Sequence, residues 1–282
     1  MKKRIINVRE DDNIISLLGN NGISKNKVKT FVKLGFVSVN NKVINKLPYF
    51  VKDGDEIVID DSNKIDLDII YEDDNYLVVN KENGLLTIST SNNNKIFEDT
   101  LYKLVREYLN NKKEYAFIVN RIDKETSGIV IFVKKEWLKN KLQDNWNSIV
   151  KSRKYIALVS GKITKSGRID NYLYEDKLTV SHSTNIGGKR AITNYYPIKY
   201  NDKYTLLDIN IETGRKNQIR VHMGEMKHPI VGDKKYYSKD NSFKRLMLHH
   251  YEISLINPID NKLIVFKCSN PYEFNNIFNS DC

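Results

Sequence analysis

Six short apolar runs, each rich in β-branched and aromatic residues, constrain the fold of this chain more than any other feature. They lie at residues 76–80, 115–119, 129–133, 155–159, 205–211 and 263–267. Runs of this length and composition are typical of β-strands. Between them, residues 96–111 carry apolar side chains three and four residues apart, which predicts one helix. The apolar positions of this helix are Phe97, Leu101, Leu104, Val105 and Tyr108. The sequence therefore predicts an α+β domain dominated by its sheet.

The first 62 residues indicate a small α+β module of their own. In "GISKNKVKTFVKLG", Ser24 is a good N-cap and Gly35 stands just past the end of a short predicted helix. The next segment alternates apolar and polar residues around Asn40 and Asn41, which tolerate positive φ and predict a tight hairpin. The stretch "VKDGDEIVI" then predicts a turn and a closing strand.

The predicted helix of this module carries a row of lysines. Lys25, Lys29 and Lys33 recur every four residues and so project from one face. A solvated face on any small module would look the same, so the row alone does not establish a binding surface. The polar segment at residues 60–66 is a plausible linker to a larger domain at residues 67–282.

The charge balance points to a polyanionic partner. Lys and Arg number 46 against 35 Asp and Glu, a formal net charge of +11 over 282 residues. Nucleic acid is the first candidate and an acidic membrane surface the second. No apolar run approaches the roughly 20 residues of a spanning helix, and no apolar signal-peptide core follows the basic N-terminus. We therefore expect no membrane association, no export and a cytoplasmic location.

Several other classes of chemistry lack their sequence signals. Only Cys268 and Cys282 occur, so a disulfide framework is not expected. Neither G-x-G-x-x-G nor G-x-x-x-x-G-K-[ST] is present, and we expect no cofactor. His222, Glu225 and His228 lack the spacing of a zinc motif, and no metal is expected.

The loop in "VNRIDKETSGIVIFVK", residues 119–134, places a carboxylate between two apolar runs. Asp123 follows Arg121 by two residues and precedes Thr126 by three. Loop aspartates commonly accept hydrogen bonds from the backbone or a nearby threonine and fix a turn. The functional alternative is a nucleophile or general base whose ionised form is held by a nearby arginine.

Two later segments offer partners for this carboxylate. In "KSRKYIALVSG", Tyr155 lies in a predicted strand, where it could be a packed core aromatic or a catalytic group. The segment "ETGRKNQIRVHM" supplies Arg215, Gln218, Arg220 and His222, a set of donors that fits phosphate contact or carboxylate pairing. A solvated basic turn is the simpler explanation of that set.

Taken in order, these segments resemble the motifs of the RluA-type pseudouridine synthases. "NRIDKETSG" matches the catalytic-loop pattern His-Arg-Leu-Asp-x-x-Thr-Ser-Gly, and the two segments above match the tyrosine strand and the arginine segment. "IIYEDDNYLVVNKENG" and "RLMLHHYEISLINPI" match the start and end of the domain, so the resemblance covers almost all of residues 67–272. The first module, at residues 1–62, resembles the small RNA-binding domain named after the S-four ribosomal protein. The resemblance implies a mainly antiparallel central sheet with flanking helices.

The resemblance also implies an activity: conversion of uridine in RNA to pseudouridine, without cofactor or metal. Asp123 would be the nucleophile, Tyr155 would stack on the target uracil and contribute to the later proton removal, and Arg215 would pair with the aspartate. Arg121 would hold the flipped-out nucleotide. The further expected substrate contacts are Thr126, Gln218, Arg220 and the lysine row Lys25, Lys29 and Lys33.

The chain departs from the family pattern at three places. Asn120 stands where the family usually has His, Asn217 where it often has His, and Glu82 where Pro commonly follows the lysine. These changes bear on the hydrogen bonds that shape the loop and on which RNA site is modified.

Three functions are consistent with the sequence. The first is a monomeric pseudouridine synthase acting on large-subunit ribosomal RNA, with transfer RNA as the less favoured substrate. The second is a non-catalytic RNA-binding or ribosome-assembly factor that keeps the fold. The third, a phosphate-binding enzyme for small substrates, leaves the lysine row unexplained.

Overall fold

The computed structural model describes residues 3–33, 35–60, 67–89, 100–175, 181–184, 187–236, 242–275 and 277–278. These residues form two compact units, one within Met1–Asp66 and the other within Leu67–Thr90 and Thr100–Cys282. The boundary falls in the segment that the sequence analysis expects to be a linker.

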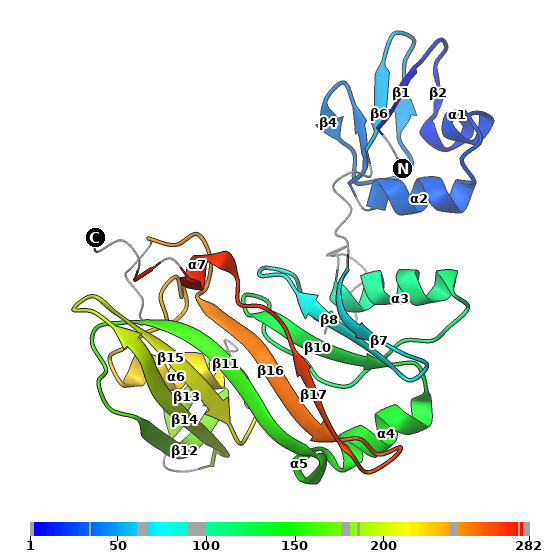
Figure 1. The fold of residues 1–282 in the computed structure, drawn as a ribbon. Helices are drawn as coiled ribbons and strands as arrows, with labels where there is room; N and C mark the ends of the chain where they lie inside the picture. The colour runs from blue at the N-terminus through cyan, green and yellow to red at the C-terminus, as the bar shows by residue number, and fades with distance from the viewer. Residues whose placement is uncertain are drawn as a thin grey trace. The chain divides into compact units, whose positions relative to one another are not determined.

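The first unit is a small sheet with two helices and a core of its own (Figure 1). Its elements are β1 (Arg4–Asn7), β2 (Asp12–Asn13), α1 (Ile14–Asn20), α2 (Lys25–Lys33), β3 (Val37–Val39), β4 (Lys42–Val43), β5 (Phe50–Val51) and β6 (Glu56–Ile59). Four strands pair in the order β1-β6-β3-β4, and β2 pairs with β5. The apolar face of α2 supplies Val28, Phe31 and Val32 to the core, as its periodicity predicts.

The turns of this unit form where the sequence places them. Helix α2 begins directly after Ser24, and Gly35 follows its end with φ 71°. The β3–β4 hairpin turns at Asn40 and Asn41, whose φ angles are 48° and 63°. Asparagine tolerates this left-handed conformation, so the turn residues set the register of the hairpin.

The second unit is built on one large sheet with helices packed around it (Figure 1). Its strands are β7 (Asp68–Glu72), β8 (Tyr76–Lys81), β9 (Phe117–Ile118), β10 (Ser127–Val133), β11 (Val150–Ser160), β12 (Gly167–Glu175), β13 (Ser181–Thr184), β14 (Lys189–Tyr200), β15 (Tyr204–Ile211), β16 (Leu248–Ile256) and β17 (Leu263–Lys267). Its helices are α3 (Leu101–Asn111), α4 (Glu136–Asp144), α5 (Trp146–Ile149), α6 (Gln218–Glu225) and α7 (Tyr272–Asn275).

The described strands of this unit form an 11-stranded sheet in the order β13-β12-β14-β15-β11-β16-β10-β8-β7, with β17 on β16 and β9 on β10. Among these strands only β10 and β16 pair in parallel. They pair at Gly128, where a Cβ atom would lie 2.2 Å from the His250 carbonyl oxygen. Gly128 also has φ 117°, which only glycine adopts freely. This close approach explains why position 128, at the start of β10, is a glycine.

All six predicted strands are present, and the α+β class dominated by an antiparallel sheet is confirmed. The second run is shorter than predicted, because Tyr115 is 74% exposed and only Phe117 and Ile118 pair with β10. Helix α3 begins at Leu101, where the side chain of Thr100 caps it by accepting a hydrogen bond from the Lys103 amide. Residues 96–99 of the predicted helix lie outside the described residues. No helix in the described part of the chain is long and apolar enough to cross a membrane.

Candidate active site

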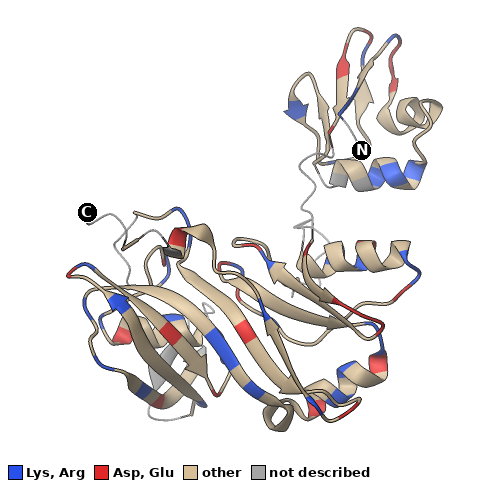
Figure 2. Ribbon diagram, in the orientation of Figure 1, with Lys and Arg blue, Asp and Glu red and all other residues tan. Residues whose placement is uncertain are grey.

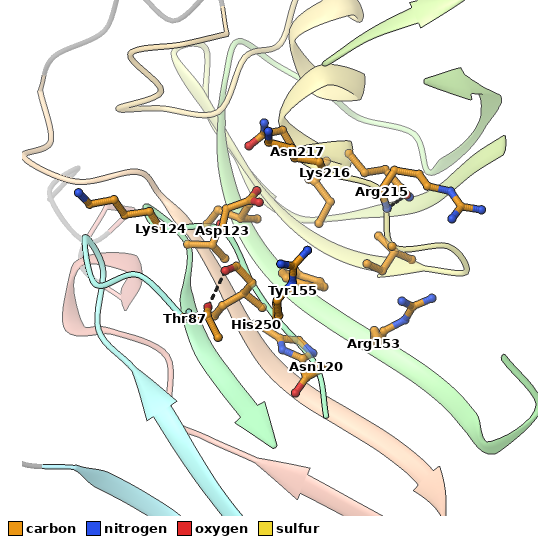
Figure 3. Close-up of a pocket in the computed structure, with 18 of the residues that line it drawn as sticks. Thr87, Asn120, Asp123, Lys124, Arg153, Tyr155, Arg215, Lys216, Asn217 and His250 are labelled. Atoms are coloured by element: carbon orange, nitrogen blue, oxygen red, sulfur yellow. Dashed lines mark hydrogen bonds between the residues drawn. The ribbon is translucent and has the colours of Figure 1, made fainter. Parts of the chain in front are cut away.

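A cavity of about 940 Å³ in the second unit brings together three segments that are far apart in the sequence. The loop between β9 and β10 contributes Asp123, the first half of β11 contributes Tyr155, and the segment entering α6 contributes Asn217 (Figure 3). The candidate loop, tyrosine strand and arginine segment therefore meet in one place, as the resemblance implies.

The loop is held by hydrogen bonds to its backbone. The Thr126 amide donates to the Asp123 carbonyl at 3.1 Å and closes a turn. The hydroxyl of Thr87 donates to the Ile122 carbonyl at 2.7 Å (Figure 3), and the Gly84 amide donates to the Lys124 carbonyl at 2.9 Å. Because these bonds use the backbone, the Asp123 carboxylate is left to face the cavity.

Lys81 is the contributor to this loop that sequence reasoning missed. It is 1% exposed, and its ammonium group donates to the carbonyl oxygens of Glu82, Leu85 and Lys124 at 2.7–3.0 Å. Burial lowers the pKa of Lys81 to about 7, although nearby carboxylates, Asp123 among them, favour its charged form. The sequence signal was a lysine at the end of the apolar strand "YLVVNK". Because a strand-end lysine is ordinarily exposed, this signal did not predict burial; a lysine that is buried needs several acceptors.

Asp123 is half-buried and surrounded by positive charge. Burial raises the pKa of the Asp123 carboxyl, because the low-dielectric surroundings disfavour its charged form. The Arg220 guanidinium, a hydrogen bond from the Asn217 backbone, and the charges of Lys81 and Lys216 all lower it. Asn217 is the N-cap residue of helix α6, so the carboxylate also lies near the N-terminus of this helix, where the helix dipole favours negative charge.

The expected ion pair between Arg215 and Asp123 is not formed. Arg215 is exposed, and its Nε atom donates to the Arg190 carbonyl oxygen at 2.9 Å. Figure 3 shows its side chain directed away from Asp123. The reason is its place in the chain: Arg215 precedes α6 in a turn, and Arg220, within the helix, supplies the charge next to the aspartate.

Gln218 and Arg220 also differ from the expectation that they bind substrate directly. Gln218 accepts hydrogen bonds from the Thr213 hydroxyl and the Arg215 amide and donates two more to Ile192 and Thr193. Its amide is therefore saturated by the protein. It fixes the turn that precedes α6.

Arg220 is committed to a buried ion pair. Its guanidinium forms two bonds of 2.8 Å with the Asp233 carboxylate and one of 2.9 Å with the Asn217 side chain. The departure at Asn217 thus has a structural use, since its amide also donates to the Tyr236 hydroxyl at 3.1 Å. Arg220 acts on Asp123 through its charge.

Tyr155 is 8% exposed, and its ring stacks on His250 at a centroid distance of 4.5 Å and an interplanar angle of 18°. The tyrosine is therefore a packed aromatic and also a wall of the cavity. Burial and the charge of Asp123 raise the pKa of its phenol, and Arg153 opposes this shift. Its hydroxyl forms no hydrogen bond within the described chain, which leaves it available to a ligand.

The remaining candidates fall into two groups. Arg121 and Thr126 line the cavity, the first exposed and the second buried with no hydrogen-bond partner for its hydroxyl. Lys25 and Lys29 are exposed on α2 of the other unit, and basic residues are spaced along this helix (Figure 2). The side chain of Lys33 lies outside the described residues.

No group of three His, Cys, Asp or Glu among the described residues is placed to hold a metal ion. His222, one of the three weighed for zinc, is instead hydrogen-bonded through both ring nitrogens, to Thr193 at 2.9 Å and to Asn171 at 2.8 Å. Burial lowers its pKa to about 4.

The charges around Asp123 predict a pH effect. A reaction that needs the carboxylate slows as pH falls through the Asp123 pKa, and this pKa lies above the ordinary 3.8. Replacing Lys216 by Gln removes a charge that lowers the pKa, so the acid limb of the rate should move to higher pH. Single-turnover rates at saturating substrate measure this limb. The control is Lys244→Gln, which changes an exposed lysine outside the cavity. If the acid limb moved equally in both variants, or in neither, it would not report the ionisation of Asp123.

Comparison with known proteins adds a second kind of evidence. Residues 75–225 match the family model described as RNA pseudouridylate synthase. Ribosomal large subunit pseudouridine synthase D of Pasteurella multocida is 30% identical over 279 residues, 89% of this chain and 85% of that relative. An uncharacterized RNA pseudouridine synthase of Bacillus subtilis, YhcT, is 30% identical over 264 residues, 87% of this chain and 83% of that relative.

The fold is similar to that of a solved human structure. Human RNA Pseudouridylate Synthase Domain Containing 1 superposes with a TM-score of 0.61 over 73% of this chain and 84% of its own, at 20% identity.

Proposed function

The chain belongs to the RluA-type family of RNA pseudouridine synthases, and from this membership we propose that it modifies large-subunit ribosomal RNA with Asp123 as the nucleophile. The observation that carries the proposal is the meeting of a half-buried carboxylate, surrounded by positive charges, with the ring of Tyr155 in one cavity. The substrate class is supported by relatives named as large-subunit enzymes.

The chemistry accounts for these residue types. Pseudouridine formation breaks the bond between uracil N1 and ribose C1′, turns the base over and forms a bond from C5 to C1′. N1 gains a proton and C5 loses one, so no other reactant is consumed. Asp123 attacks as the carboxylate, which the charges of Arg220, Lys81 and Lys216 favour against the effect of burial.

The cavity also requires the uridine to leave its helix. A stacked base cannot reach Asp123, so the target is flipped out or already unpaired, at a cost of a few kcal/mol. Stacking on an aromatic ring returns roughly 1–3 kcal/mol per base. Tyr155, held against His250, offers such a ring, and Arg121 at the exposed edge of the cavity holds the extruded nucleotide.

The unit within residues 1–62 is proposed to be an RNA-binding module of the S-four type. Its support is the exposed lysine row on α2 beside an independent core. Replacing Lys25 and Lys29 by Ala should weaken RNA binding and reduce the slope of log K against log salt by roughly 1.4–1.8, because each lost phosphate contact removes about 0.7–0.9.

The matched control for this prediction is Lys42→Ala with Lys46→Ala, two exposed lysines of the same unit that lie off α2. Fluorescence anisotropy with a ribosomal RNA fragment at several salt concentrations gives both slopes. Equal slopes for the two double variants would show that only net charge matters.

The test of the proposed function is incubation of the purified protein with unmodified large-subunit ribosomal RNA and, separately, transfer RNA, followed by mapping of new pseudouridines. We expect product in the ribosomal RNA. Binding without any product would favour the alternative, a non-catalytic RNA-binding or assembly factor. The enzyme is proposed to act as a monomer, in the cytoplasm where this RNA is found.

A further inference from the structure

Three arginines that line the cavity form no ion pair with a carboxylate among the described residues: Arg121 on the loop, Arg153 on β11 and Arg215 before α6. Arg121 is already proposed to hold the extruded nucleotide, which leaves Arg153 and Arg215 without a role. Arg153 Nη2 donates to the Glu212 carbonyl oxygen at 2.5 Å, and Arg215 Nε donates to the Arg190 carbonyl oxygen at 2.9 Å. A guanidinium has five N–H donors, so most of their donors remain unused.

Other arginines of the same unit behave differently. Arg168 pairs with Glu212 and Asp170, Arg190 with Asp170, and Arg220 with Asp233. Arg245, outside the cavity, has no carboxylate partner within the described part of the chain, but it donates to both the Ser127 hydroxyl and the Leu246 carbonyl oxygen. Arg153 and Arg215 each donate from their side chains to a single carbonyl oxygen among the described residues.

The Arg153 side chain also lies against the segment that carries Arg215. A Cβ atom on Gly214 would lie 2.7 Å from Arg153 Nη1, so the Arg153 side chain rests on the residue that precedes Arg215. Burial is the largest cause that lowers the pKa of Arg153. The charge of Arg215 lowers this pKa further, as expected of two like charges. Figure 3 shows both arginines on the side of the cavity away from Asp123. An anion bound between them would relieve their repulsion.

We propose that Arg153 and Arg215 form a binding site for a phosphodiester group adjacent to the extruded uridine. This proposal rests on the proposed function only in taking an RNA nucleotide as the ligand. Guanidinium groups suit this role, because their planar donors match two phosphate oxygens at once. The site would hold the backbone while the base turns over at Asp123, and it gives Arg215 a role other than pairing with the aspartate.

The test compares two small probes, uridine and uridine 3′,5′-bisphosphate, by calorimetric titration of the full chain. The wild type should bind the bisphosphate more tightly than uridine. Arg153→Ala and Arg215→Ala should each weaken bisphosphate binding by about tenfold, the size of one charge-assisted contact at a partly exposed site. Uridine binding should not change. Arg106→Ala, an exposed arginine of α3 outside the cavity, is the control for charge.

A second variant tests the site without changing charge. Gly214→Ala displaces the Arg153 guanidinium, the mobile end of a long side chain, and should weaken bisphosphate binding by a smaller factor while leaving uridine binding intact. The site is refuted if the wild type binds the two probes equally well, or if Arg153→Ala and Arg215→Ala weaken the binding of both probes equally. It is also refuted if Arg106→Ala weakens bisphosphate binding as much as Arg153→Ala does. Because the readout is binding, an enzyme that forms no pseudouridine would refute the proposed function and leave this test intact.

Discussion

Asp123→Asn should abolish pseudouridine formation, lowering the single-turnover rate by about 10⁴-fold or more, as loss of a covalent nucleophile commonly does. The amide keeps the size of the side chain but cannot attack carbon. RNA affinity should stay within a few fold, because the arginines and lysines that contact phosphate are unchanged. Rates are measured as pseudouridine formed per enzyme, and affinity by anisotropy.

Two controls make this result specific. Glu125→Gln removes a negative charge from an exposed residue of the same loop and should retain activity. Asp123→Asn should also be no less stable than the wild type, because burial disfavours the charged carboxylate in the folded state. An Asn variant that still converts uridine, or a Gln variant that is equally inactive, would remove Asp123 from its role.

The largest effect on stability is expected at Asp233→Asn. Asp233 is 0% exposed in its side chain and forms a two-bond pair with Arg220, so its neutralisation leaves a buried guanidinium uncompensated. Breaking a buried pair in this way costs about 3–5 kcal/mol. Urea unfolding followed by tryptophan fluorescence reports on this unit, since Trp137 and Trp146 both lie in it.

The chain contains a matched control for that experiment. Arg190 and Asp170 form a pair of the same geometry, with bonds of 2.8 and 2.6 Å, but their side chains are 56% and 31% exposed. Asp170→Asn should leave the urea midpoint essentially unchanged, because water solvates exposed charges. Equal destabilisation by the two variants would show that burial of the Arg220 pair is not what matters.

The sequence was most informative where local chemistry decides the structure. Asn40 and Asn41 turn the hairpin, Ser24 precedes α2, and the apolar runs form the strands, because turn residues and side-chain periodicity act over a few residues. The meeting of Asp123 with Tyr155 could be expected only from the resemblance, since the first lies in the loop between β9 and β10 and the second on β11.

The arrangement of charges could not be predicted from the sequence. Which arginine faces Asp123 depends on where α6 begins, and this is fixed by Asn217 in a left-handed conformation with φ 55°. Arg215 lies in the turn before α6 and is directed away from Asp123 (Figure 3), whereas Arg220, within the helix, places its charge near the aspartate. Lys81 is a similar case, because its three acceptors come from two segments that are distant in the sequence.

The most direct test is a structure of the enzyme with an RNA oligonucleotide that spans the mapped uridine. We expect the extruded base on the Tyr155 ring, with its reacting atoms within roughly 3.5 Å of the Asp123 carboxylate, the spacing of a reactive complex. RNA bound with its uridine stacked in the helix, or seated in a cavity that Asp123 does not line, would contradict the account.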